Sequence, residues 1–150
     1  MFLHSAIDGY SRLAYTESLP DEKAVTARSR SSSVREPGSL RHGINSIERV
    51  VTDNGFCYRA NAFRDAIGES RHQRITPYTP RHNGKIERYN RILAEDFLYA
   101  RAWHSEQERA AALEIWNRHY NYHRPHGAHD GQPPASATPS RVNDVLASFT

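Results

Sequence analysis

Asp53 stands where a metal ligand could be expected. It directly follows the run SIERVVT (46–52), which is typical of a β-strand, and Asn54-Gly55 then turns the chain. Ligands of α/β sheets usually bind at the carboxyl ends of strands, and hard divalent cations take oxygen ligands. The structural alternative is that the Asp53 carboxylate caps the turn by accepting hydrogen bonds from backbone amides. Taken alone, the tetrapeptide favours the structural alternative.

Glu87 is the second candidate, in the first turn of an expected helix. The helix dipole by itself favours an acid at that position. The neighbouring residues are basic, with Arg81, Lys85, Arg88 and Arg91 around the acid. Cations beside a metal-binding carboxylate suit a phosphodiester substrate, because they hold the backbone while the metal activates a nucleophile. A helix-surface acid and a metal ligand therefore remain two hypotheses for Glu87.

Histidines and cysteine give weaker signals. His119 and His123 lie one helical turn apart, but the HExxH glutamate is absent, so packing of a helix end is favoured over zinc binding. We expect His72 and His82 at the surface or against phosphate. Cys57 is the only cysteine, which excludes a disulfide within one chain and favours a reducing compartment.

Composition limits the class of protein. The chain has 150 residues with 37% hydrophobic content, which fits one domain with a modest core. A formal net charge of +3 and nine histidines lean toward nucleic acid as a partner. No apolar run approaches the roughly 18 residues of a membrane span, and the N-terminus lacks a signal-peptide pattern. We therefore expect a cytoplasmic protein with no membrane partner.

The pattern of apolar residues predicts a mixed α/β domain with its helices in the C-terminal half. Two strands (2–8 and 13–19) form a hairpin, and a helix opens at 21–27. The later elements are strands at 46–52 and 71–76, a loop at 77–84, and helices at 59–69, 85–100 and 105–123. Ser105 followed by Glu108 predicts a capping box at the start of the last helix.

Two segments do not fit such a domain. Residues 28–40 (RSRSSSVREPGSL) show no apolar periodicity and are interpreted as loop or disorder. Residues 128–150 are rich in Pro, Gly, Ser and Ala, and we expect an extended or disordered tail. The predicted division is a core at 1–127 and a tail at 128–150.

Several motifs together resemble a known family. They are VVTDNG (50–55), ITPYTPRHNGKIERYNRIL (75–93), WNRHYNYHRPHGA (116–128) and PPAS (133–136). These segments resemble the integrase-type DDE transposases of bacterial insertion sequences, most closely the IS481-like group. IS3-type transposases and retroviral integrases are wider relatives. The resemblance covers residues 2–27 and 42–136.

The resemblance implies a ribonuclease-H-like fold and a mechanism in which three acids hold two metal ions, Mg²⁺ or Mn²⁺. It implies DNA transposition or integration by phosphodiester cleavage and strand transfer. Asp53 matches the second acid and Glu87 the third. The family's YN-x-x-RPH motif matches Tyr120, Asn121, Arg124, Pro125 and His126. The residues expected to bind DNA are Arg81, Asn83, Lys85, Arg88, Arg91 and Arg124.

The chain departs from the family pattern in ways that bear on activity. In the family the first acid lies on a strand before the one at 2–8, so we expect an N-terminally truncated core whose sheet lacks its first strand. Asp8 is the less favoured alternative for that acid. The anomaly at 28–40 suggests a local frameshift, and the separation of Asp53 and Glu87 is slightly shorter than usual. Whether the chain is an enzyme is thus uncertain.

These departures give a second hypothesis. The chain is then a non-catalytic remnant that binds DNA or a full-length transposase, or forms a homo-oligomer. Loss of one of three carboxylates from a two-metal site should remove most of the activity.

Overall fold

The computed structural model describes residues 2–19, 46–59, 61–76, 79, 83–137 and 141–149. The helix expected to open at 21–27 and the anomalous segment 28–40 lie outside these residues, as does most of the loop expected at 77–84.

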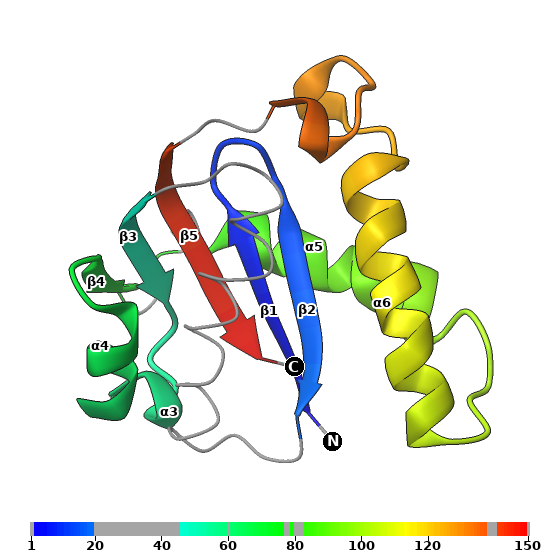
Figure 1. Cartoon of the computed structure of the whole chain (residues 1–150), viewed down its shortest axis with the longest axis horizontal. Helices are drawn as coiled ribbons and strands as arrows, with labels where there is room; N and C mark the ends of the chain where they lie inside the picture. The colour runs from blue at the N-terminus through cyan, green and yellow to red at the C-terminus, as the bar shows by residue number, and fades with distance from the viewer. Residues whose placement is uncertain are drawn as a thin grey trace.

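Five strands form one mixed sheet in the order β2-β1-β5-β3-β4 (Figure 1). Their bounds are β1 (Phe2–Asp8), β2 (Ala14–Leu19), β3 (Ser46–Thr52), β4 (Arg71–Arg74) and β5 (Arg141–Phe149). Strand β1 is antiparallel to both β2 and β5, whereas β3 is parallel to both β4 and β5. The predicted hairpin and the two predicted later strands are confirmed, although β4 ends at Arg74.

The strand at the centre of the sheet comes from the last residues of the structure. The prediction of an extended or disordered tail is wrong for residues 141–149, which form β5 between β1 and β3. The reason is the apolar run Val145-Leu146-Ala147, whose side chains are buried together with that of Ser148. Among the described strands, β5 alone is hydrogen-bonded to both β1 and β3. Strand β5 therefore joins the β1–β2 hairpin to the parallel pair β3 and β4.

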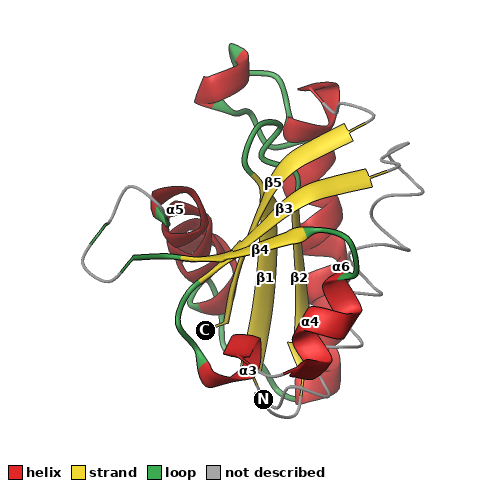
Figure 2. Ribbon diagram, turned by 90° about the vertical axis from the view of Figure 1, so that its left-hand side faces the viewer, coloured by secondary structure: helices red, strands yellow, loops and turns green. Residues whose placement is uncertain are grey.

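Side-chain alternation along the strands gives the sheet two apolar faces. One face packs against α5 (Gly84–Leu93) and α6 (Glu106–Tyr122), and the other against α3 (Phe56–Arg59) and α4 (Asn61–Ile67). Figure 2 shows α5 and α4 on opposite sides of the strands. The first face contributes Leu3, Ile7, Val51 and Leu146, and the second Ala6, Val50, Val145 and Ala147.

The predicted helices form with small changes. The segment expected as one helix at 85–100 is α5 followed by a π-helical turn, η3 (Ala94–Leu98). The N-cap half of the predicted capping box is confirmed, because the Ser105 hydroxyl accepts a hydrogen bond from the Glu108 amide at 3.1 Å. The Glu108 carboxylate accepts from the amide of His104 at 3.0 Å. Two short 3₁₀ turns, η4 (Gly127–His129) and η5 (Pro134–Ala137), follow α6. Within the described residues, no helix combines the length and apolar character needed to span a membrane.

Candidate metal and nucleic-acid site

Asp53 leaves the carboxyl end of β3 and is half-buried. Its Oδ1 accepts a hydrogen bond from the Gly55 amide at 2.7 Å. The turn-capping interpretation is therefore realised in the structure. It does not exclude metal binding, since a carboxylate has two oxygens and several lone pairs.

The alternation of side chains places Asp53 on the α5 side of the sheet. Val51 belongs to the cluster that packs on α5, whereas the Thr52 hydroxyl lies on the opposite side, 2.9 Å from His72 Nε2. Asp53 is the next residue, so continuing the alternation returns it to the α5 side.

Ser148 lies beside Asp53 on the neighbouring strand β5. Thr52 of β3 pairs with Ala147 of β5, so Ser148 follows at the level of Asp53. Ser148 is buried, and its hydroxyl accepts a hydrogen bond from Asn90 Nδ2 at 2.8 Å. Because Asn90 lies on α5, this contact fixes the helix above the end of β5 next to Asp53.

Glu87 reaches the same region from α5. It precedes Asn90 by three positions, a spacing that makes two residues neighbours on one face of a helix. Its side chain is exposed, whereas Ile86 and Tyr89 on the adjoining face are buried against the sheet. Asp53 thus follows Thr52 next to Ser148 on β5, and Glu87 lies one helical turn before Asn90, which contacts the same serine.

Asp8 does not join these acids. It pairs with Val145 of β5, three residues along from the level where Ser5 pairs with Ser148. Val145 packs on the face opposite α5, and Asp8 shares that face by alternation. The buried Asp8 carboxylate caps the β1–β2 turn, with Oδ2 accepting from the Ser11 amide at 2.7 Å and the Ser11 hydroxyl at 2.5 Å. These contacts support a structural role.

The donor atoms around the acid pair suit a hard cation. Two amide oxygens, Asn83 Oδ1 and Asn90 Oδ1, are buried without a hydrogen-bond partner, and their positions flank Glu87 along one face of α5. Carboxylate and amide oxygens are the ligands that Mg²⁺ and Mn²⁺ accept. Across the residues the structure describes, no group of three or more His, Cys, Asp and Glu side chains could hold a metal ion. Any cation held here would therefore need neutral oxygens in addition to carboxylates.

A chain of hydroxyls crosses the sheet beside Ser148. Ser5 Oγ lies 3.0 Å from Thr16 Oγ1, which lies 2.6 Å from the hydroxyl of Tyr89 on α5. Burial raises the pKa of Tyr89 far above its usual range, so the phenol stays protonated. These contacts anchor α5 to β1 and β2 without adding charge.

The residues expected to bind DNA differ in their exposure and in their contacts. Lys85 Nζ donates to the carbonyl of Gly9 at 2.7 Å, and Arg88 and Arg91 are exposed on α5. Arg124 follows α6 and forms an ion pair with Asp96 at 3.3 Å. Asn83 is buried at the start of α5, and Arg81 lies outside the described residues. The structure therefore gathers a basic surface around α5 and the end of α6.

The histidine pair of α6 has no further ligand in the described part of the chain. The rings of His119 and His123 stack with centroids 6.3 Å apart, and both side chains are exposed. Two exposed imidazoles alone do not complete a zinc site.

Sequence reasoning missed Asn90 and Ser148 as part of the site. Asn90 had a usable signal, because it lies three residues after a candidate acid on a predicted helix. Ser148 had none, because the segment containing it was predicted to be disordered.

Comparison with known proteins identifies the architecture. The sequence model described as "Integrase core domain" matches residues 68–134, less than half of the chain. That match covers β4, α5 and α6, including Glu87, and stops before β5.

Two solved structures share the fold across most of the chain. The first is the simian T-cell lymphotropic virus intasome in complex with PP2A regulatory subunit B56 gamma. It matches with a TM-score of 0.69 and 22% identity over 91% of this chain and 47% of that chain. The second is the catalytic core domain of BIV integrase, with a TM-score of 0.67 and 19% identity over 91% of this chain and 84% of that chain.

The fold is ribonuclease-H-like, as predicted: a mixed five-stranded sheet with flanking helices. This chain spans about half the length of the matching chain in the simian viral assembly.

Proposed function

We propose that the chain is an integrase-type, DNA-acting core in which Asp53 and Glu87 hold a divalent metal ion. The observation that supports the proposal most is that Ser148, which follows the residue paired with Thr52, accepts a hydrogen bond from Asn90, one helical turn after Glu87 on α5. The integrase-core match over residues 68–134 and the shared fold support it.

Each group has a role that its chemistry suits. Asp53 and Glu87 would hold Mg²⁺ or Mn²⁺, which supplies Lewis-acid activation of a water or a DNA 3′-hydroxyl when bound. Lys85, Arg88 and Arg91 on α5 bind backbone phosphates, since they present positive charge beside the acids. The buried hydroxyl chain ending at Tyr89 holds α5 in register with the sheet.

We further infer that strand transfer by this chain is impaired. The resemblance to DDE transposases implies three acids, whereas β5 contributes the uncharged hydroxyl of Ser148, which is hydrogen-bonded to Asn90 on α5. A hydroxyl is uncharged at neutral pH and is a weaker ligand for a bridging metal than a carboxylate. A chain that lacks the third carboxylate would keep its binding to DNA, or to another transposase chain, while its cleavage of DNA would be slow.

Thermal melting with Mg²⁺ or Mn²⁺ tests the metal site. A ligand at about 100 times its dissociation constant stabilises the folded state by roughly 2.7 kcal/mol. We expect either metal to raise the melting temperature of the parent but of neither Asp53→Asn nor Glu87→Gln. An equal metal response in all three proteins would refute the assignment of the two acids.

Nicking of supercoiled plasmid in Mn²⁺ tests the impairment. We expect weak nicking by the parent, none by Glu87→Gln, and a gain in Ser148→Asp, which adds a third carboxylate. Ser148→Ala is the matched control and should show no gain. Efficient cutting by the parent would show that two carboxylates suffice, and the impairment would be wrong.

A further inference from the structure

The turn between β1 and β2 gathers cationic side chains around its backbone carbonyls. The guanidinium of Arg12 donates through Nη1 to the carbonyl of Gly9, and Lys85 Nζ donates to the same oxygen at 2.7 Å. Two positive charges within a few ångströms of one another repel, and a single neutral carbonyl compensates this only in part. Such an arrangement favours a nearby anion.

Side chains from after α6 extend this cluster. His129 Nε2 lies 2.8 Å from the Ser11 carbonyl, so that nitrogen carries the proton and donates. The ring of His126 lies 5.9 Å from that of His129. Figure 1 shows the segment after α6 beside the β1–β2 turn.

Two arginines complete the cluster from different elements. Burial lowers the pKa of His126, and the positive charges of His129, Arg12, Arg124 and Arg88 lower it further. Arg88 follows Lys85 by three positions on α5, and Arg124 precedes His126 by two positions. Side chains from three segments therefore contribute to one surface, called here the turn cluster (Arg12, Lys85, Arg88, Arg124, His126 and His129). Its formal positive charges are those of the three arginines and Lys85.

Four acids lie near the turn cluster in the structure or in the sequence, and two of them have partners of their own. Asp8 is buried beneath the turn, where its Oδ2 accepts two hydrogen bonds from Ser11. Asp96 faces Arg124 at 3.3 Å. Glu87 precedes Arg88 and belongs to the acid pair, and Asp130 follows His129 on the exposed rim. The solvent-facing part of the cluster thus keeps an excess of positive charge.

An exposed aromatic ring stands in the same turn. Tyr10 is 68% exposed and lies between Gly9 and Arg12 in the chain. Exposing a large ring costs hydration free energy, and aromatic side chains beside cations are typical of surfaces on which nucleotides stack.

We propose that the turn cluster binds a backbone phosphate of DNA, with Arg12 as its central donor and Tyr10 against the adjoining nucleotide. The proposal rests on the proposed function, because Lys85 and Arg88 flank Glu87 on α5. A DNA strand held at the turn therefore continues along α5 to the acid pair. Asp8 serves this site from below by fixing the turn through Ser11.

Fluorescence anisotropy with a labelled DNA duplex at several salt concentrations tests the site. Arg12→Gln should weaken binding several-fold and reduce the slope of log K against log salt by about one, as expected for one lost phosphate contact. Tyr10→Ser should weaken binding roughly fivefold or more without changing that slope, because stacking releases no counterions.

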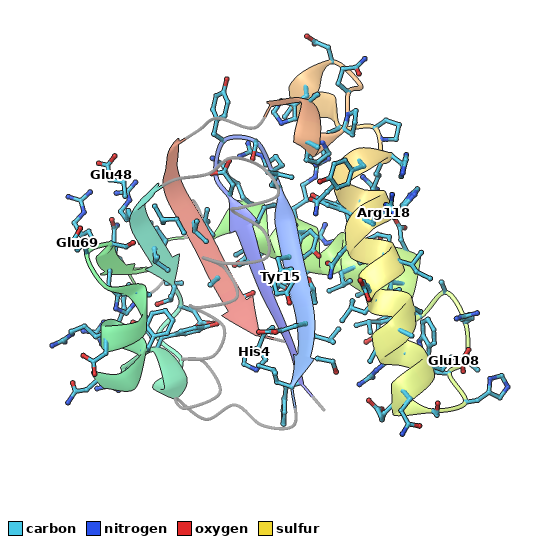
Figure 3. All side chains as sticks on the ribbon, in the orientation of Figure 1. His4, Tyr15, Glu48, Glu69, Glu108 and Arg118 are labelled. Carbon is cyan, nitrogen blue, oxygen red and sulfur yellow. The ribbon has the colours of Figure 1, made fainter. Side chains whose placement is uncertain are left out.

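Two controls separate this site from general charge and from misfolding. Arg118→Gln removes an exposed cation of α6 away from the turn (Figure 3), and should leave affinity nearly unchanged. Arg12→Lys should restore the salt slope if charge at the turn is the cause. Far-UV circular dichroism melts confirm that each variant is folded at the assay temperature.

The outcomes distinguish the two proposals. If the parent binds DNA, and the variants Arg12→Gln and Tyr10→Ser bind it as tightly as the parent, then the turn cluster is not a DNA-binding site. The proposed function is unaffected by that result. If Arg118→Gln loses as much as Arg12→Gln, binding is unspecific and the site is likewise overturned. Absence of DNA binding by the parent overturns both, and tighter binding to an RNA duplex of the same sequence overturns the choice of DNA.

Discussion

The side-chain amide of Asn121 is hydrogen-bonded to both backbone groups of Ala14. Its Oδ1 accepts from the Ala14 amide at 2.8 Å, and its Nδ2 donates to the Ala14 carbonyl at 2.7 Å. Asn117 repeats the contact with Thr16, at 3.0 Å and 2.7 Å. A spacing of four residues along α6 thus matches a spacing of two residues along β2. Helix α6 occupies the outer edge of β2, which would otherwise be open to pairing with another chain.

We predict that Asn121→Ala lowers the free energy of unfolding by about 2–4 kcal/mol, because two backbone groups lose their partners at a buried position. Urea unfolding followed by circular dichroism measures the loss.

Asn117→Ala is the matched comparison and should cost less, since its contacts to Thr16 are only partly buried. Equal, small losses in both variants would mean that water replaces the asparagine amides at no cost. A concentration-dependent increase in size of Asn121→Ala by light scattering would show that the uncovered edge recruits another chain.

Asp53 has a structural contact that can be separated from its proposed chemistry. Asp53→Asn keeps an oxygen that accepts from the Gly55 amide, whereas Asp53→Ala removes it. We predict that Asp53→Ala destabilises the protein by about 1 kcal/mol and Asp53→Asn by less than about 0.5 kcal/mol. Both variants should lose the metal-dependent rise in melting temperature. Retention of that rise in Asp53→Asn would show that the carboxylate charge is not needed for binding.

The sequence predicted those elements whose signals are local. The apolar run before Asp53, the capping pair Ser105 and Glu108 and the stripe that buries Ile86 and Tyr89 each lie within one segment, and the corresponding elements formed as expected. A strand end and a helix face were enough to nominate both acids.

What the sequence could not predict depends on tertiary pairing. Strand β5 lies in a segment whose composition is typical of disorder, and only pairing with both β1 and β3 orders it. Ser148 enters the site with that strand. Asn121 lies in a motif that resembles the family's. Its partner Ala14 is distant in sequence, and the two come into contact only because α6 lies along β2.

The contribution of β5 to the core gives a further prediction. Leu146 is 6% exposed and packs in the cluster beneath α5 and α6. Leu146→Ala should cost about 2–5 kcal/mol, the range for removing a buried leucine side chain. Ile115→Ala on α6 is the control, since Ile115 is 72% exposed and its loss should cost less than about 0.5 kcal/mol. If Leu146→Ala were as mild as Ile115→Ala in urea unfolding, β5 would not be an integral strand.

His72 makes stability depend on pH. Burial, followed by the charges of Arg74 and Arg64, lowers the pKa of His72 below its ordinary value of 6.5. The unfolded chain therefore binds a proton first as the pH falls, and stability decreases from about pH 6.5 down to the lower pKa of the folded state. Above pH 6.5 both states are neutral and the His72 contribution is constant.

We predict that His72→Gln has a shallower loss of stability than the parent between neutral pH and about pH 5, since it removes one group whose pKa differs between the two states. Part of the slope should remain, because burial also lowers the pKa of His126. Exposed His119→Gln is the matched control for the substitution itself. Urea unfolding at a series of pH values measures all three. A slope in His72→Gln equal to that of the parent would mean that the 2.9 Å contact between His72 and Thr52 survives protonation of the ring.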